Sequence, residues 1–259
     1  MHRVHSDNIF DILPLFDFDF PNQTALLSCA NGEIPGEFYV NDPTIPTACV
    51  AVIGFYNWTF IGGGPEQDWL NHTFAILQKD RFLMLIWAEW VTSCIQPPPE
   101  FTQTINRYEF LDSPLTVVHT DSRLAPDQRL NIVRMDQELF SRCLWNSEMT
   151  LAYGCHQSFL DFGLGFCLMR GNEICCEVYA VFRAKQRYEI GVITPEAYRG
   201  LGYAYKACSF LSKQCAREGF KTSWSCNQEN NSSVGLARKL GYKIEREYQM
   251  LHYPVQRNK

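Results

Sequence analysis

The chain has 259 residues, of which 46% are hydrophobic and 14% aromatic, so it can bury the core of one large domain or two small ones. That composition excludes a disordered chain. A formal charge of −5 leaves no excess of Lys and Arg to neutralise phosphates, which argues against a general nucleic-acid binder. The N-terminus lacks the charged-then-apolar build of a signal peptide, and no apolar run reaches the ~18 residues that span a bilayer. We therefore expect a cytoplasmic protein without a membrane partner.

Eleven cysteines could suggest a disulfide or metal framework. Their number is odd, no Cys-x-x-Cys occurs, and the side chains of the adjacent pair Cys175 and Cys176 would diverge on a strand. Most of the others lie within apolar patterns, where a free thiol behaves as a small hydrophobe. We expect structural thiols in a reducing compartment and no bound metal.

The first half of the chain mixes helical and strand patterns. The expected elements are a short helix over residues 7–18, strands over 36–41, 48–60 and 108–118, and a helix over 69–79. Residues 82–90 fit either a buried strand or a helix. The glycines of residues 62–64, followed by Pro65, could hold a phosphate, but no helix with a fitting pattern follows at once, so we interpret them as a turn. The aromatic residues at 55–60 fit either a core or the lining of a pocket.

Residues 121–129 are polar and contain a proline, which predicts a linker between lobes 1–126 and 127–259. The second lobe has clearer patterns than the first. Its expected elements are strands over 131–134, 165–169, 174–182, 188–194, 222–226 and 242–253, and helices over 136–145, 158–160, 204–218 and 232–241.

The segment from residue 188 to residue 218 organises this lobe. A strand stopped by Pro195 leads through a glycine-containing turn into a helix with one apolar stripe, made of Ala204, Cys208, Leu211 and Cys215. Gly219 predicts a left-handed C-terminal cap on which Phe220 can fold back. The first amides of a helix lack partners within it, and glycines let an anion approach them. The turn therefore fits a phosphorylated ligand, although its glycines could also simply make the corner.

Two motifs carry a resemblance to a known family. The pattern Arg-x-x-Gly-x-Ala of Arg199, Gly202 and Ala204 after a strand resembles the pyrophosphate-binding loop of the GCN5-related N-acetyltransferase (GNAT) superfamily. A downstream run is similar to the second signature of that superfamily: Asn230, Ser233, Leu236, Ala237, Lys239, Gly241 and Tyr242. With residues 163–173 and Trp224, the set resembles a bacterial subfamily of two-lobed proteins. The resemblance is strong over 127–253 and weak over 1–126.

The resemblance implies a fold of the α+β class with a mixed α/β sheet. It places the GNAT acyl-CoA N-acyltransferase fold in the C-terminal half, after a smaller α/β lobe that we expect to be a degenerate GNAT-like copy capping the acceptor pocket. It also implies that acetyl-CoA is the co-substrate. The residues expected to bind its diphosphate are Arg199, Gly200, Leu201, Gly202, Tyr203 and Ala204, and those expected at its pantetheine arm are Val192, Ile193, Thr194 and Asn230. Asn230 could equally be a turn or helix-cap residue.

The acceptor amine must lose a proton, because an alkylamine with a pKa of about 10.4 is almost fully charged at neutral pH. Glu189 stands where related enzymes often carry an acid–base residue, and we expect it to be the base, although a solvated strand-edge carboxylate is the alternative. Glu177 is a second candidate. Cys175 and Cys176 could act as nucleophiles, but neither has a histidine at local spacing, so we assign them to the core.

One position departs from the family pattern. Many members have a tyrosine, the expected general acid, where this chain has Ala237. Tyr203, Tyr242, Tyr248 or water could replace it, and a thiolate of pKa about 8.5 is already a fair leaving group.

We expect an N-acetyltransferase that moves the acetyl group directly to a primary amine of a small molecule, as a monomer or homodimer. Two alternatives remain: a non-catalytic acyl-CoA-binding sensor or scaffold, and a protein or peptide N-acetyltransferase.

Overall fold

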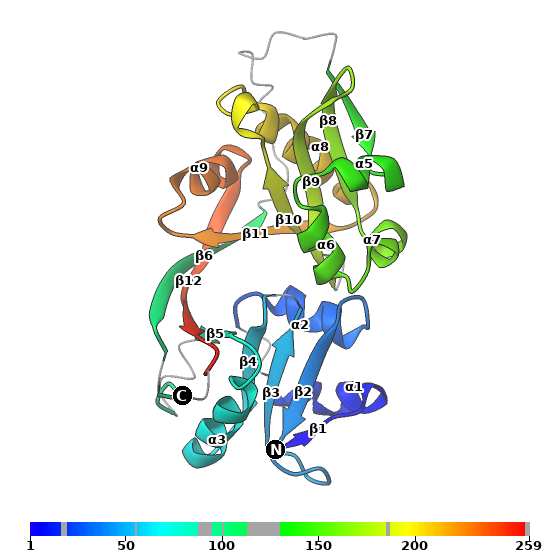
Figure 1. Ribbon diagram of the computed structural model, residues 1–259. Coiled ribbons are helices and arrows are strands. Elements are labelled where there is room, and N and C mark those ends of the chain that lie inside the picture. Colours follow the sequence, from blue (N-terminus) through cyan, green and yellow to red (C-terminus); the bar gives the residue numbers. More distant parts are fainter. Residues whose placement is uncertain are drawn as a thin grey trace. The chain divides into compact units, whose positions relative to one another are not determined.

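The computed structural model describes residues 1–16, 20–54, 56–87, 95–99, 101–112, 130–184 and 187–256 (Figure 1). The chain divides into two compact units, Met1–Tyr108 with Arg246–Lys259, and Glu109–Glu245. The expected linker, 121–129, lies outside the described residues. The division differs from lobes 1–126 and 127–259 because the C-terminal segment belongs with the first unit. Strands β6 (Gln103–Asp112) and β12 (Tyr242–Tyr253) therefore contribute residues to both units.

The first unit is built on one mixed sheet with the strand order β1-β2-β3-β4-β5-β12. Its strands are β1 (His2–Arg3), β2 (Gly36–Val40), β3 (Ala48–Ile53), β4 (Trp58–Gly63) and β5 (Leu83–Trp87). Its helical segments are η1 (Ser6–Asn8), α1 (Ile9–Ile12), η2 (Leu13–Leu15), α2 (Gln23–Ala30) and α3 (Gln67–Leu77). Strands β2, β3 and β4 pair antiparallel, and α3 then leads to β5, which lies parallel to β4.

One strand expected in this unit was wrong, and one helix was not expected. The strand expected over 48–60 is a hairpin, because Gly54 and Asn57 both adopt positive φ and turn the chain between β3 and β4. Helix α2 was not predicted. Every residue of α2 after Gln23 is buried, so the helix has no polar face and shows no amphipathic pattern. The helix expected over 69–79 is confirmed as α3, and the apolar segment after residue 82 forms a strand, β5, as far as the described residues extend.

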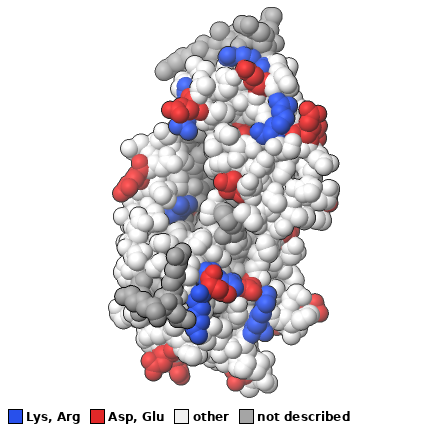
Figure 2. Space-filling view, in the orientation of Figure 1, with Lys and Arg blue, Asp and Glu red and all other residues white. Residues whose placement is uncertain are grey.

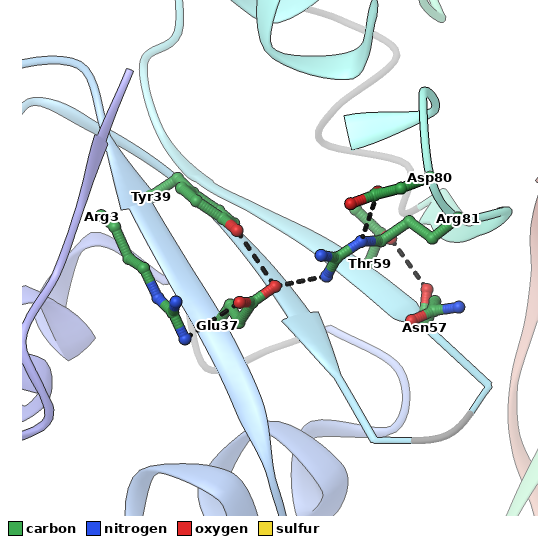
Figure 3. Close-up of polar contacts among 7 residues, drawn as sticks. All are labelled: Arg3, Glu37, Tyr39, Asn57, Thr59, Asp80 and Arg81. Carbon is green, nitrogen blue, oxygen red and sulfur yellow. Dashed lines mark hydrogen bonds and ion pairs between the residues drawn. The ribbon is translucent and has the colours of Figure 1, made fainter. Parts of the chain in front are cut away.

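A network of charged side chains connects three segments of this unit (Figure 3). Glu37 on β2 lies between two arginines, with Arg3 at 2.9 Å and Arg81 in direct contact through a hydrogen-bonded ion pair. Tyr39, two residues further along β2, donates its hydroxyl to Glu37 at 3.0 Å. Because Arg3 is on β1 and Arg81 precedes β5, one carboxylate connects three segments that are distant in sequence.

The second unit has the strand order β11-β10-β9-β8-β7. Its strands are β7 (Leu130–Arg134), β8 (Gly165–Arg170), β9 (Glu173–Ala184), β10 (Arg187–Ile193) and β11 (Lys221–Asn227). Its helices are α5 (Gln137–Arg142), α6 (Asn146–Ala152), α7 (His156–Phe162), η3 (Glu196–Tyr198), α8 (Tyr203–Arg217) and α9 (Asn231–Lys239). Asp136 caps α5 as expected, by accepting the Leu139 amide at 2.9 Å. The helix expected to reach Trp145 ends at Arg142, however, and Trp145 precedes α6 instead.

Helix α8 packs on the sheet through the predicted apolar stripe. Cys208, Leu211 and Cys215 are fully buried, while Ala204 is only partly covered. Gly219 adopts a φ of +80° after the helix, and the amide of Phe220 donates to the Cys215 carbonyl at 2.8 Å. The Phe220 ring then packs against the ring of Tyr188 on β10 in a tilted arrangement, with 4.7 Å between the ring centroids. The expected C-terminal cap is therefore confirmed, and it fixes the end of α8 to the start of β10.

The same strand order and directions occur in both units. In the first, β2, β3 and β4 form an antiparallel set, and α3 crosses to the parallel strand β5. In the second, β8, β9 and β10 form the antiparallel set, and α8 crosses to the parallel strand β11. The two units differ at the connection from the last antiparallel strand to the crossover helix, which joins β4 to α3 in the first unit and β10 to α8 in the second.

Candidate active site

The loop between β10 and α8 lies at the surface. Arg199, Gly200 and Leu201 are exposed, and Gly200 and Gly202 both have a φ of +76°, which residues with a Cβ rarely adopt. Helix α8 starts at Tyr203 with no side-chain cap among the described residues and no acidic residue in its first turn. Uncapped first amides and the positive end of the helix dipole favour an anion at this position.

Strand β10 loses its parallel neighbour just before this loop. Its register with β11 runs over Arg187 to Glu189, which pair with Lys221 to Ser223. Beyond Glu189, the described pairing of β10 is with β9 alone, and the β9 register shifts at the same point. Gly191 lets the strand lie against Tyr179, because a Cβ there would come within 2.6 Å of the phenol ring. Within the part of the chain that the structure describes, the edge of β10 on the β11 side is therefore not paired with a strand over residues 190–193, which include Val192 and Ile193.

Glu189 is the last residue of the paired stretch. Tyr188 packs toward the end of α8, so alternation directs Glu189 to the opposite face of the sheet. Its carboxylate is buried and accepts a hydrogen bond from Ser225 Oγ of β11 at 2.5 Å. The structure thus excludes a solvated edge carboxylate and places a fixed carboxylate where the two strands separate.

Glu177 is held by the backbone of another segment. Its Oε1 accepts the Leu144 amide at 2.7 Å, and its Oε2 accepts the Trp145 amide at 3.4 Å. Burial raises the pKa of Glu177 above its usual value, although the two backbone donors favour its charged form. This residue joins β9 to the connection between α5 and α6, which is a structural role.

Asn230 is the N-cap of α9. Its side chain accepts the Ser233 amide at 3.1 Å, so the cap interpretation of this residue is what the structure shows. The hydroxyl of Ser233 in turn accepts the indole N–H of Trp224 at 2.9 Å. The cap fixes the start of α9 against β11, and the Nδ2 group of Asn230 takes no part in the bond to Ser233.

The tyrosines considered as general acids all have structural partners. Tyr203 accepts a hydrogen bond from Arg170, and the buried Tyr242 donates to Thr222 Oγ1 at 2.7 Å. Tyr248 belongs to the first unit, where its hydroxyl bonds Asn22 at 2.6 Å and Arg107 at 2.7 Å. Ala237 is fully buried in α9. These contacts give each hydroxyl a structural role, and the assignment of one of them as the general acid stays a prediction.

The ten described cysteines are free thiols, and all but Cys155 are buried. Burial raises the pKa of Cys176 to about 12, so its sulfur stays protonated and accepts a hydrogen bond from Thr194 Oγ1 at 3.4 Å. Burial also raises the pKa of Cys175. A protonated, buried thiol is a poor nucleophile, which supports the assignment of both residues to the core.

Several residues at this site were not predicted. Ser225, Arg170 and Tyr198 carry no motif, and each acquires its role through a contact across the sheet or loop. Arg170 lies within residues 163–173, for which the sequence predicted no site role, yet its side chain reaches the start of α8. A cavity of about 520 Å³ also lies among α5, α6 and α7, and it contains none of the predicted site residues; its lining is Gln137, Phe140, Ser141, Asn146, Ser147, Thr150, Leu151 and His156.

Within the described part of the chain, no cluster of three or more His, Cys, Asp or Glu is arranged to hold a metal ion. No described helix has the length and apolar character needed to cross a membrane. On the face shown in Figure 2, acidic and basic side chains lie in small mixed groups.

Comparison with known proteins identifies the family. The family model described as GNAT acetyltransferase matches residues 14–251, which is nearly the whole chain. The chain belongs to the GNAT acetyltransferase family. It is therefore an acyltransferase, with the GNAT fold in a mixed α/β sheet.

Individual relatives agree with this assignment. The uncharacterized N-acetyltransferase YdfB of Bacillus subtilis (strain 168) is 28% identical over 235 residues, covering 87% of this chain and 88% of that protein. A GCN5-related N-acetyltransferase-like protein from Streptococcus suis 89/1591 has a TM-score of 0.73 at 24% identity, over 96% of this chain and 99% of that one. A tandem GNAT protein from the clavulanic acid biosynthesis pathway has a TM-score of 0.61 at 9% identity, over 100% and 99% of the two chains. These two structures show the fold alone.

Proposed function

We propose that this protein transfers an acetyl group from acetyl-CoA to the primary amine of a small molecule, without a covalent enzyme intermediate. One observation carries the proposal: a strand edge that pairs with no strand among the described residues leads, through Pro195 and the short η3, into an exposed glycine loop at the uncapped start of a helix. An acyl-CoA has an amide-rich arm followed by a diphosphate, and the two parts of this segment match that order.

The residues of the loop and of the strand edge would each hold one part of acetyl-CoA, the carrier of the acetyl group. The amides of residues 200–204, with the charge of Arg199, would hold the diphosphate. The arm would pair with the edge of β10 at Val192, Ile193 and Thr194, as a peptide adds to a sheet edge. Asn230 would use its amide group toward the arm while its oxygen caps α9.

Glu189 would act as the base. The ammonium form of the acceptor gives a proton to this carboxylate, and the neutral nitrogen attacks the thioester carbonyl. The C–N bond forms, the C–S bond breaks, the nitrogen loses its second proton to solvent, and the coenzyme leaves as a thiolate that takes up a proton from solvent. The hydrogen bond from Ser225 fixes the carboxylate, and the absence of a tyrosine at Ala237 leaves protonation of the thiolate to solvent.

The first unit would be a degenerate copy of the same fold that no longer binds the carrier. At its strand-to-helix connection, Gly63 lies so close to Thr47 that a Cβ would come within 2.1 Å of the Thr47 carbonyl oxygen. Helix α3 begins after Glu66 and has Asp68 in its first turn. Acidic side chains at this position satisfy the helix dipole and repel a diphosphate.

A non-catalytic acyl-CoA sensor is the second candidate, and Ala237 is the residue that favours it. A thiol-release assay separates the two: acetyl-CoA is mixed with the protein and a panel of amines, including peptides, and free thiol is measured. Release that depends on a small amine and is lost in Glu189→Gln supports the proposal. Binding of acetyl-CoA without release under any amine supports the sensor, and preference for peptides supports a protein N-acetyltransferase.

A further inference from the structure

One arginine contacts both residues that flank the glycine loop, Tyr198 and Tyr203. Arg170, the last residue of β8, donates from Nη2 to the hydroxyl of Tyr203, the first residue of α8. Its guanidinium also lies over the rings of Tyr198 and Tyr203, at 5.9 Å and 5.7 Å from their centroids. Tyr198 immediately precedes residues 199–202 and Tyr203 immediately follows them. The loop is therefore held at its two ends by a single side chain from a different part of the sheet.

A second contact strengthens this connection. The hydroxyl of Tyr198 donates to Glu173 Oε2 at 2.7 Å, and Glu173 is the strand partner of Arg170 in the hairpin between β8 and β9. The two tyrosine rings are 6.2 Å apart. The hairpin thus supplies a cation for both rings and an acceptor for one hydroxyl.

The loop itself needs such support. It is exposed and contains two glycines, which have more backbone freedom than any other residue. A free loop would lose that freedom when its amides close on an anion, and the loss would weaken binding. Fixing Tyr198 and Tyr203 removes much of the freedom in advance, and the guanidinium adds positive charge beside the start of α8.

We infer that Arg170 is a positioning residue for the diphosphate of the carrier: it holds both ends of loop 199–202 so that the loop amides are preorganised to bind. This inference rests on the proposed function and deepens it. Arg170 acts through Tyr198 and Tyr203 and is remote from the acyl group, so it determines affinity for the carrier and leaves the rate of transfer to other residues.

Calorimetry of the full chain with coenzyme A and with dephospho-coenzyme A tests the inference. Arg170→Gln should weaken both ligands by the same factor, about 10- to 100-fold, which is the usual effect of removing a charge-assisted hydrogen bond. Arg170→Lys keeps the charge and one donor, and should recover part of the loss. In the thiol-release assay, Arg170→Gln should raise the KM for acetyl-CoA and leave kcat within about twofold.

Arg142→Gln is the matched control. Arg142 holds the same hairpin from α5, through Asn172, and none of its described contacts lies in the loop. This variant should bind both ligands as the wild type does. Equal losses in Arg142→Gln and Arg170→Gln, or wild-type affinity in Arg170→Gln, would overturn the inference, as would a loss confined to coenzyme A, which would mark a direct contact with the 3′-phosphate. If the wild-type protein binds neither ligand, the proposed function fails as well.

Discussion

The carboxylate of Glu189 accepts a 2.5 Å hydrogen bond from the hydroxyl of Ser225, across the two parallel strands at the point where their pairing ends. The last two residue pairs before this point are buried, and beyond it the described pairing of β10 is with β9 alone. The carboxyl group at this boundary is fixed by a neighbouring strand and lies next to the segment that we assign to the carrier. This arrangement suits a base that must meet an amine beside a thioester.

We predict that Glu189→Gln lowers kcat by about 10²- to 10⁴-fold, the usual contribution of a positioned base, and leaves the affinity for acetyl-CoA unchanged. Glutamine keeps the size of the side chain and can still accept the Ser225 hydroxyl, so the fold should persist. Steady-state thiol release and calorimetry on the same preparation measure the two effects separately.

Glu177→Gln is the control for that prediction, because it alters the other buried carboxylate on the neighbouring strand. Its amide group can accept only one of the two backbone donors, Leu144 and Trp145, at full strength. We expect a lower melting temperature and a kcat close to that of the wild type. A large loss of kcat in Glu177→Gln with little loss in Glu189→Gln would reverse the roles of the two residues.

The glycine loop provides a second prediction. Gly202→Val should abolish measurable affinity for acetyl-CoA, because a β-branched residue does not adopt a φ of +76° and the first amides of α8 would move. Gly219→Val is the matched control, since Gly219 has a φ of +80° at the other end of the same helix and an added Cβ would meet nothing within 4 Å. Both variants should lose stability, about 1–3 kcal/mol each. Calorimetry with acetyl-CoA should show binding only in Gly219→Val, and binding in both would refute the loop assignment.

The parts of the fold that the sequence predicted are those controlled by local chemistry. The strand stopped by Pro195, the apolar stripe of α8 and the cap at Gly219 each depend on residues within a few positions of one another. The buried helix α2 was missed because a helix covered on all sides has no periodic pattern. Gly54 and Asn57 were likewise missed as a turn, because the segment around them is apolar on both sides.

The site residues also divide into those that the sequence predicted and those that depend on contacts between distant segments. The glycine loop and Glu189 stand in sequence patterns, whereas Arg170 reaches Tyr203 from 33 positions away and Glu177 reaches Leu144 across an equal distance. No spacing rule connects residues so far apart, since their contacts exist only once the strands have paired. The cap role of Asn230 could be read from Ser233 three positions later, but the choice between cap and ligand required the observed bond.

The network around Glu37 provides a pH-dependent prediction (Figure 3). Burial alone would raise the pKa of Glu37, but hydrogen bonds from Arg81 and Tyr39, with the charges of Arg81 and Arg3, lower it below its usual value of 4.5. A carboxylate with a lowered pKa in the folded state stabilises the protein above its unfolded-state pKa, and this stabilisation is lost as the pH falls through the folded-state value. Glu37→Gln should therefore reduce the free energy of unfolding at pH 7 by about 1–2 kcal/mol, because part of the network is exposed.

Urea denaturation at several pH values measures this effect. The difference between wild type and Glu37→Gln should shrink as the pH falls below 4.5, where the carboxylate takes up a proton. Asp80→Asn is the control: Asp80 also pairs with Arg81, at 3.1 Å, but its side chain is 70% exposed, so its removal should change stability by less than about 0.5 kcal/mol. A gap between wild type and Glu37→Gln that stays constant from neutral to acidic pH would show that the ion pairs contribute nothing to stability.

The stoichiometry of carrier binding tests whether the repeated topology carries two sites or one. In the first unit, the Gly64 amide donates to the Thr47 carbonyl at 3.0 Å, so at least one amide of that connection is already engaged. Glu66 and Asp68 add negative charge at the start of α3, whereas the first turn of α8 contains no acidic residue and Arg199 lies shortly before it. We therefore predict that calorimetry finds one molecule of coenzyme A per chain, and that Gly202→Val reduces this to none. A second equivalent in the wild type, or a remaining equivalent in Gly202→Val, would place a working carrier site in the first unit, because the substitution leaves that unit intact.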